Sequence, residues 1–199
     1  MLFRSESKIL RACFLDSAKE LPVKQGNSLV LEDSVGGVPE KIEQAVRSGV
    51  DVLWMGDFDG SCLLPMLSAA EAGALVVCNV TAGNSAGALD ALLAAAKPED
   101  KALARTMLAS VLKAIVVQRL LPGAAEGSGA MPAWEVLFNS QNIATCIRSG
   151  DHFKLPSVIA ASASDGMMLM DDSLAELVRS GYVAREDAEK FVVNPSRFA

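Results

Sequence analysis

The sequence has 199 residues, of which 51% are hydrophobic and 5% aromatic, and its 18 basic and 24 acidic side chains give a net charge of −6. A chain of this length buries roughly 70% of the surface that its unfolded form exposes, so it needs no disulfide or metal to hold a core. No run of basic residues rises above the background. Nucleic acid is therefore not an expected partner, because binding a phosphate backbone needs a concentrated basic face.

The first half of the sequence predicts strands that alternate with helices. Strands are expected at residues 10–15, 28–31, 50–55 and 74–80, and helices at residues 39–48, 63–72 and 85–96. Gly73 stands where a helix is expected to end in a C-terminal cap. The longer strand segments are continuously apolar rather than alternating, so both faces of each strand should be covered. This pattern is typical of a parallel α/β sheet.

The second half is expected to be mostly helical. A long helix is predicted over residues 100–121, then a loop rich in Gly, Ala and Ser over residues 122–129 and a strand over residues 133–138. Further helices are expected at residues 141–148, 155–161, 167–180 and 185–192. We therefore expect an α/β fold with a parallel sheet of about four or five strands and a helical C-terminal layer. Residues 1–121 and 122–199 should form the two parts of one compact unit.

The cysteines and the N-terminus predict a cytoplasmic protein. The four cysteines are scattered without CxxC or CxxH spacing: Cys13, Cys62, Cys78 and Cys146. Disulfide and zinc frameworks need paired spacing, so we expect reduced thiols packed as small apolar groups and no metal site. The segment MLFRSESK lacks the apolar centre of a signal peptide, and no stretch of 18 uncharged apolar residues occurs. Insertion into a membrane is not expected.

Five motifs follow one another in the second half of the sequence. They are residues 110–122 (SVLKAIVVQRLLP), 133–139 (AWEVLFN), 147–150 (IRSG), 155–159 (LPSVI) and 166–186 (GMMLMDDSLAELVRSGYVARE). In this order they resemble motifs of the type IV pilus retraction and type II secretion ATPases of the PilT type. In that family the first motif is expected to be a helix and the second a strand. The resemblance implies a RecA-like α/β fold.

The first half resembles the same family more loosely, at four positions in the right order. Residues 11–21 (RACFLDSAKEL) stand at its Asp box, 51–57 (DVLWMGD) at its Walker B strand, 69–73 (AAEAG) at an AAETG segment and 75–86 (LVVCNVTAGNSA) at its His box. By this resemblance the candidate catalytic residues are Asp57, at the Walker B position, and Asp16 and Glu20, in the Asp box. The family uses ATP and Mg²⁺.

The residues that phosphoryl transfer needs are missing or altered. No G-x-x-x-x-G-K-[ST] phosphate loop occurs in the sequence, so the sheet should lack the strand that leads into this loop. Asp57 is one methylene shorter than the family's Glu, and Asp16-Ser17-Ala18 replaces its Glu-Asp-Pro. The His-box histidine is replaced by Thr81 or Ala82. A family arginine falls on Glu43, although Arg47 remains.

These losses are spread over separate positions, which favours a degenerate homologue over a shortened active enzyme. We therefore expect a pseudo-ATPase without bound cofactor that acts through protein contacts, with pilus or secretion motor subunits as partners. The alternative is the C-terminal portion of a longer, ATP-hydrolysing retraction motor.

Simpler structural roles stand beside the catalytic ones. Asp57 is equally well explained as a residue that caps the turn after its strand. Asp16 and Glu20 are better explained as solvated turn residues than as a working metal site. His152, the one histidine of the sequence, is expected to be a solvated surface residue.

Overall fold

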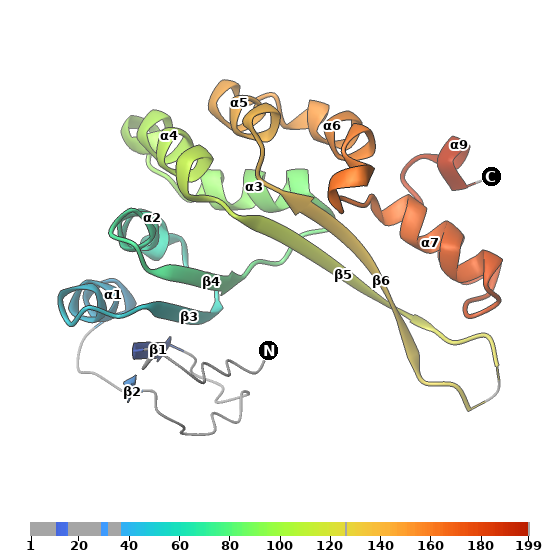
Figure 1. Cartoon of the computed structure of the whole chain (residues 1–199), viewed down its shortest axis with the longest axis horizontal. Coiled ribbons are helices and arrows are strands. Elements are labelled where there is room, and N and C mark those ends of the chain that lie inside the picture. The colour runs from blue at the N-terminus through green and yellow to red at the C-terminus, as the bar shows by residue number, and fades with distance from the viewer. Residues whose placement is uncertain (1–10, 16–28, 32–36, 126, 199) are drawn as a thin grey trace. The chain divides into compact units, whose positions relative to one another are not determined.

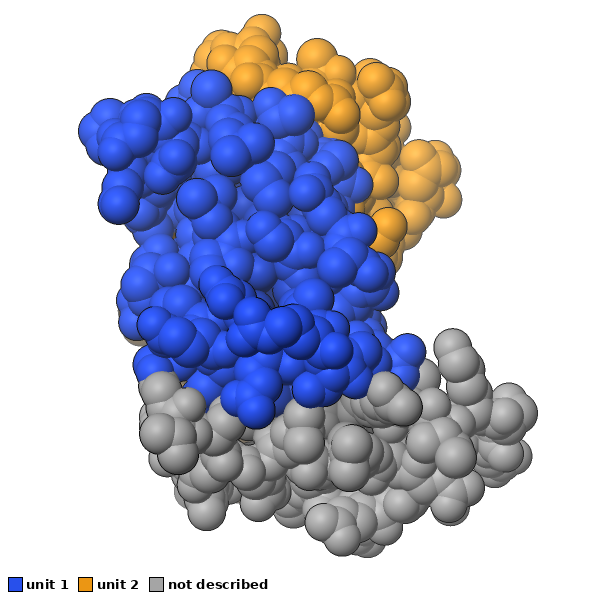
Figure 2. All heavy atoms as spheres, turned by 90° about the vertical axis from the view of Figure 1, so that its left-hand side faces the viewer, with its two compact units in different colours: residues 1–81, 92–111 blue, residues 82–91, 112–199 orange. Residues whose placement is uncertain are grey.

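The computed structural model describes residues 11–15, 29–31, 37–125 and 127–198. Two compact units make up the chain (Figure 2). Unit 1 comprises Met1–Thr81 and Leu92–Val111, and unit 2 comprises Ala82–Ala91 and Leu112–Ala199. The boundary expected after residue 121 stays a prediction.

Unit 1 contains a four-stranded parallel sheet, as the continuous apolar segments predict. Its strands lie in the order β2-β1-β3-β4. Their bounds are β1 (Arg11–Leu15), β2 (Leu29–Leu31), β3 (Val52–Asp57) and β4 (Leu75–Asn79). The register between β3 and β4 shifts at Gly56, so that Met55 pairs with Cys78 and Asp57 pairs with Asn79. This irregularity falls at the end of β3 where the Walker B carboxylate is expected.

Helices α1 (Val38–Arg47), α2 (Leu63–Glu71) and α4 (Lys101–Val111) complete unit 1, with short 3-10 turns η1 (Gly60–Cys62) and η2 (Pro98–Asp100) (Figure 1). Pro39 lies in the first turn of α1, where its missing N–H costs no helical hydrogen bond. The core between α1, α2 and the sheet contains fully buried side chains, among them Ile42, Leu53, Met55 and Cys62. Gly73 has a φ of +104°, which confirms that α2 ends in a left-handed residue.

The expected coverage of both strand faces holds for β3 and is wrong for β4. In β3, Leu53 and Met55 are almost completely buried, at 0% and 1% exposure. In β4, no side chain is fully buried, and Leu75 is 41% exposed. The reason is the strand order, which places β4 last among the described strands of this sheet.

The main strands of unit 2 form an antiparallel hairpin, β5 (Ala114–Pro122) and β6 (Ala130–Phe138), whose pairing runs from Ala114↔Phe138 to Pro122↔Ala130. The predicted helix over residues 100–121 is therefore wrong in its second half, because α4 ends at Val111 and β5 follows. The β-branched run Ile115-Val116-Val117 favours an extended backbone. Motif 110–122 thus spans a helix end and a strand, rather than the single helix that the resemblance implied.

Unit 2 also contains helices. They are α3 (Ser85–Ala94, whose last residues belong to unit 1), α5 (Gln141–Ser149), α6 (Leu155–Ala161), α7 (Met170–Arg179), α8 (Arg185–Glu189) and α9 (Pro195–Phe198), with 3-10 turns η3 (His152–Lys154) and η4 (Ala163–Asp165). Helix α7 starts three residues later than predicted, because Met168 exchanges two backbone hydrogen bonds with Val136 of β6, at 2.8 and 2.9 Å. Helix α8 also ends earlier, at Glu189.

The core of unit 2 lies between the hairpin and the C-terminal helices, where Figure 1 shows α7 running beside β6. It is formed by apolar side chains from β5, β6, α7 and the segments that follow: Val117, Leu121, Ala133, Met170, Leu174, Val183, Ala188 and Phe198. Among the helices that the structure describes, none has both the length and the apolar character required to cross a bilayer.

Candidate functional site

Asp57 lies at the carboxyl end of β3, as the Walker B position requires. The next residue, Phe58, donates its backbone N–H to the carbonyl oxygen of Asn79 at 2.9 Å, which holds this end of β3 against β4. The Asp57 side chain itself is exposed. Within the described part of the chain its carboxylate forms no hydrogen bond or ion pair, so it caps no turn there and stays available to solvent.

The other residues expected at a nucleotide site do not gather around Asp57. Asp16 and Glu20 lie outside the described residues. Arg47 forms an exposed ion pair with Glu43, at 3.5 Å along α1. An exposed ion pair on a helix surface contributes little to the free energy of folding. The partner of Arg47 in this pair lies on its own helix. Of the two residues expected at the His-box position, Thr81 is exposed and Ala82 is partly buried.

These residues do not fit ATP and Mg²⁺. The triphosphate needs a cradle of backbone N–H groups and basic side chains, and Mg²⁺ needs oxygen ligands close to the phosphates. At the carboxyl end of β3, the described side chains include two exposed carboxylates, Asp57 and Asp59, and Asp59 already accepts the Ser61 N–H at 3.0 Å. No cluster of three or more His, Cys, Asp or Glu side chains suited to a metal occurs within the residues described.

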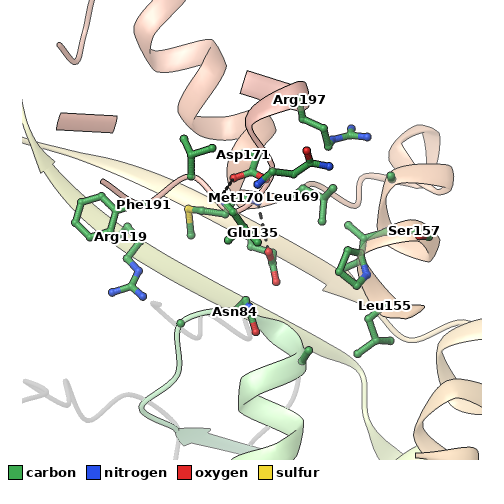
Figure 3. A pocket seen from close by; sticks show the side chains of 18 of the residues that line it. Asn84, Arg119, Glu135, Leu155, Ser157, Leu169, Met170, Asp171, Phe191 and Arg197 are labelled. Carbon is green, nitrogen blue, oxygen red and sulfur yellow. Dashed lines mark hydrogen bonds between the residues drawn. The ribbon is translucent and has the colours of Figure 1, made fainter. Parts of the chain in front are cut away.

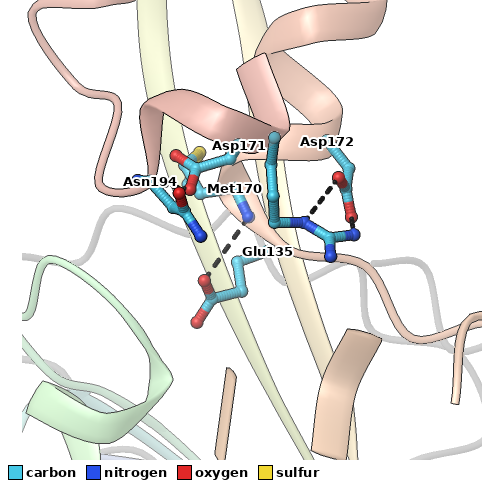
Figure 4. Close-up of polar contacts among 6 residues, drawn as sticks. Glu135, Met170, Asp171, Asp172 and Asn194 are labelled. Atoms are coloured by element: carbon cyan, nitrogen blue, oxygen red, sulfur yellow. Dashed lines mark hydrogen bonds and ion pairs between the residues drawn. The ribbon is translucent and has the colours of Figure 1, made fainter. Parts of the chain in front are cut away.

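In unit 2, Glu135 of β6 forms a buried polar centre (Figure 4). Its side chain is 5% exposed. Oε1 accepts a hydrogen bond from the Ser85 N–H at 2.6 Å, and Oε2 accepts one from the Met170 N–H at 3.4 Å. Ser85 and Met170 are the first residues of α3 and α7, whose N-terminal N–H groups have no partner within the helix. A carboxylate at this point also interacts favourably with both helix dipoles.

Two neighbouring carboxylates on α7 hold the C-terminal segment. The buried Asp171 accepts hydrogen bonds from the backbone N–H groups of Val193 and Asn194, both at 2.9 Å. Asp172 binds the guanidinium of Arg197 through two contacts, of 2.8 and 3.1 Å. Motif 166–186 therefore contributes two of its acidic residues, Asp171 and Asp172, to tertiary structure.

A cavity of about 690 Å³ lies next to this polar centre (Figure 3). Its walls combine apolar side chains with polar ones, including Asn84, Arg119, Glu135, Leu155, Leu169 and Asp171. The Arg119 guanidinium lies 5.4 Å from the centre of the Phe191 ring, a cation–π distance. Since backbone N–H groups already bind both buried carboxylates, the cavity has the chemistry of a packing or contact site rather than of an acid–base catalyst.

His152 is buried, and the expectation of a solvated surface residue is wrong. Its Nδ1 lies 2.6 Å from Oδ1 of Asp90, on α3. The contact joins η3 to a helix 62 residues earlier in the sequence. No local signal marks it, since Gly150 and Asp151, which precede the histidine, are typical of a surface loop. The contact between His152 and Asp90 could have been predicted only if the packing of α3 against η3 had been known.

The cysteines are free thiols, as expected. Burial raises the pKa of the thiols of Cys13, Cys62 and Cys78 above the ordinary value. A raised pKa lowers the fraction of reactive thiolate at neutral pH, so these side chains act as packing groups.

Comparison with curated sequences identifies several similar proteins, although no family model matches the sequence. The chain is 28% identical over 186 residues to the type IV pilus retractation ATPase PilT of Pseudomonas aeruginosa, which covers 93% of this chain and 53% of that protein. It is 30% identical over 154 residues to a twitching motility protein of Neisseria gonorrhoeae, covering 77% of this chain and 41% of that protein. The chain thus spans about half the length of the curated relatives it matches.

Solved structures give the same result for the fold. The crystal structure of the pilus retraction motor PilT with bound ADP matches 96% of this chain and 55% of its own, with a TM-score of 0.82 and 24% identity. The ATPase DotB of Legionella pneumophila matches 94% of this chain with a TM-score of 0.76 and 13% identity. The chain therefore has the fold of about half of a RecA-like ATPase. The parallel sheet and the helical C-terminal layer of this fold were predicted from the sequence.

Proposed function

Because this chain belongs to the PilT-type family of pilus retraction ATPases, we propose that it is a cytoplasmic, non-hydrolysing member that acts through contacts with pilus or secretion motor subunits. One observation carries the proposal. The motifs that resemble the family are used for packing, whereas the positions of its phosphate chemistry carry other residues. Glu135 and Asp171 are buried and bound by backbone N–H groups, but the expected Walker B position carries the shorter Asp57 and the expected His-box position carries Thr81 or Ala82.

The absence of hydrolysis is tested by phosphate release from ATP with Mg²⁺. We expect the purified chain to release no more phosphate than a heat-denatured sample of the same preparation. The Asp57→Ala variant is the matched control, because an exposed side chain that has no partner within the described ranges can be removed without unfolding the protein. Turnover that disappears in Asp57→Ala would overturn the proposal.

The contact role is tested by binding to an assembled motor. Purified P. aeruginosa PilT, the retraction ATPase that matches over 93% of this chain, is immobilised and the chain is passed over it with and without ATP. Saturable binding in the micromolar range supports a contact role. Failure to bind PilT, and likewise the PilU ATPase of the same organism, contradicts it.

A second candidate function is that of the C-terminal portion of a longer, ATP-hydrolysing retraction motor. The exposed Asp57 favours this candidate, since a carboxylate at the carboxyl edge of a parallel sheet remains accessible to a nucleotide held by further chain. The mass of the natural protein, measured in its source cells with an antibody against unit 2, separates the candidates. A protein about twice the mass of this chain, with phosphate loop peptides in its digest, would favour the longer motor.

A further inference from the structure

The cavity beside Glu135 has a cation at one end and apolar side chains at the other (Figure 3). Arg119 and Phe191 lie at one end, and Leu155 lies at the opposite end, with Glu135 between them. All the residues that line the cavity belong to unit 2. Its volume of about 690 Å³ falls within the range of pockets that hold small organic ligands, roughly 300–1,000 Å³.

Two of the three basic residues that line the cavity are paired with acidic side chains that do not line it. Lys190 Nζ lies 2.6 Å from Oδ1 of Asp187, and the Arg197 guanidinium lies 2.8 Å from Oδ2 of Asp172. The third, Arg119, forms no ion pair or hydrogen bond with any residue that the structure describes. Its charge is therefore available to an anion in the cavity.

The Arg119 guanidinium is held in place although it has no acidic partner. The Phe191 ring lies 5.4 Å from it, at a cation–π distance. On the side of the loop that leads into α3, a Cβ atom added at Gly83 would lie only 3.1 Å from Nη2 of Arg119, so a glycine there leaves room for the guanidinium. An oriented guanidinium with free N–H donors matches the planar geometry of a carboxylate, which it binds through two parallel hydrogen bonds.

The acidic residues of the cavity limit the charge that a ligand can carry. Glu135 and Asp171 both line it, both are buried, and both already accept backbone N–H groups. Two carboxylates beside one unpaired cation disfavour a phosphate or polyphosphate with several negative charges. A single negative charge, placed at the Arg119 end, is the charge that this lining accommodates.

Much of the remaining wall is apolar, including Leu155, Ile159, Leu169 and Met170. We propose that the cavity binds an apolar monocarboxylic acid, with its carboxylate on Arg119 and its hydrocarbon part against these side chains. Burial of the hydrocarbon part supplies affinity, and the guanidinium fixes the orientation. The inference goes beyond the proposed function and does not depend on it, since contacts with motor subunits require no small ligand.

Octanoate and octanamide test the recognition of the carboxylate directly, because they share one hydrocarbon chain and differ in charge. Each is titrated into the isotopically labelled full chain, and backbone amide shifts are followed by NMR. We expect octanoate to shift the amides of residues that line the cavity. It should bind about tenfold or more tightly than octanamide, the factor that a hydrogen bond to a charged group contributes. Amides of α1, in unit 1, serve as the internal control.

A substitution of Arg119 separates recognition of the charge from a general effect on folding. Arg119→Gln removes the charge and keeps a polar side chain, so it should weaken octanoate binding about tenfold or more and leave octanamide binding nearly unchanged. Arg179→Gln, on an exposed part of α7 that does not line the cavity, is the matched control and should change neither affinity. If Arg119→Gln unfolds, Ala160→Phe adds a ring to the cavity wall and should abolish the binding of both compounds.

The proposal is wrong if octanoate shifts no amide of the cavity up to about 10 mM, a concentration that detects even millimolar affinity. Equal affinities for octanoate and octanamide, or an Arg119→Gln variant that binds octanoate as tightly as the unchanged chain, would also overturn it. Inorganic phosphate that competes with octanoate at equal concentration would replace it with a general anion site. Failure of immobilised PilT to capture the chain contradicts the contact role and leaves the octanoate result intact.

Discussion

The Glu135 side chain accepts a hydrogen bond from the Ser85 backbone N–H at 2.6 Å, although the two residues lie 50 positions apart in the sequence. Through its second oxygen the same carboxylate accepts the N–H of Met170, at 3.4 Å. One side chain of β6 thus satisfies the first N–H groups of two helices that enter unit 2 from different parts of the chain. The stability of both helix starts therefore depends on its charge.

Replacing Glu135 by Gln should destabilise unit 2 by about 2 kcal/mol, because hydrogen bonds to charged groups contribute roughly 1.5–3 kcal/mol. The amide keeps one acceptor oxygen but turns an NH₂ group toward an N–H donor. Urea unfolding is followed through Trp134, which neighbours Glu135 on β6, in a Trp54→Phe background. Glu176→Gln on the exposed side of α7 is the control, and its effect should stay within about 0.5 kcal/mol. Equal effects of the two changes would contradict the assigned role.

Removing the Asp171 carboxylate should detach the segment that follows α8. Asp171→Ala leaves the N–H groups of Val193 and Asn194 without their acceptor, so we expect a loss of about 2 kcal/mol and faster amide exchange at both residues. Asp172→Ala is a matched control in the same helical turn, because it removes an ion pair with Arg197 that is over one third exposed. That pair should contribute less than about 1 kcal/mol. Unchanged exchange at Asn194 in Asp171→Ala would rule out this anchoring.

His152 should carry its proton on Nδ1 when the ring is neutral. The Asp90 carboxylate, 2.6 Å away, only accepts hydrogen bonds, so the facing nitrogen must donate. Nε2 is buried and has no hydrogen-bond partner among the residues that the structure describes. Nitrogen-15 NMR of the ring distinguishes the two tautomers directly. A spectrum with the proton on Nε2 would show that Asp90 does not orient the ring, and Asp90→Ala should shift the tautomer population toward Nε2.

The buried thiols should resist alkylation in the folded protein. Burial raises the pKa of Cys13, Cys62 and Cys78, so at pH 8 each holds less thiolate than a free cysteine, and reactivity should rise only at higher pH. We expect iodoacetamide to modify Cys62 at less than about one tenth of the rate for glutathione. In concentrated urea, which unfolds the protein, iodoacetamide should modify all four cysteines at about the rate measured for glutathione. Rapid modification of Cys62 in the native protein would contradict its burial.

Much of the fold follows from the sequence because its signals are local. Continuous apolar segments predict β3 and the parallel sheet, and Gly73 marks the end of α2, since both depend only on neighbouring residues. The helix predicted over residues 100–121 is wrong beyond Val111, because the apolar residues of β5 also match a helical repeat. The β-branched run at residues 115–117 was the better signal there.

The long-range contacts of unit 2 were not predictable from the same local patterns. Glu135 lies in a motif that the sequence identifies, but its role depends on the N-termini of two distant helices. His152 was predicted to be solvated because it is the one histidine of the sequence and stands in a loop after Gly150 and Asp151, whereas its partner, Asp90, lies 62 residues away. The position of β4 as the last described strand likewise follows from strand order, which the composition of a single strand does not specify.

The interrupted sequence of unit 2 has a consequence for synthesis on the ribosome. All residues of unit 1 have been translated when Val111 is added, but unit 2 then has only Ala82–Ala91. Since nascent chains fold from the N-terminus as they emerge, unit 1 can assemble while Ser85 still lacks the carboxylate that binds its N–H. Until Glu135 has been translated, the backbone N–H of Ser85 at the start of α3 must bind water or a chaperone instead of the carboxylate. A translational pause shortly after Val111 would therefore separate the two folding events in time.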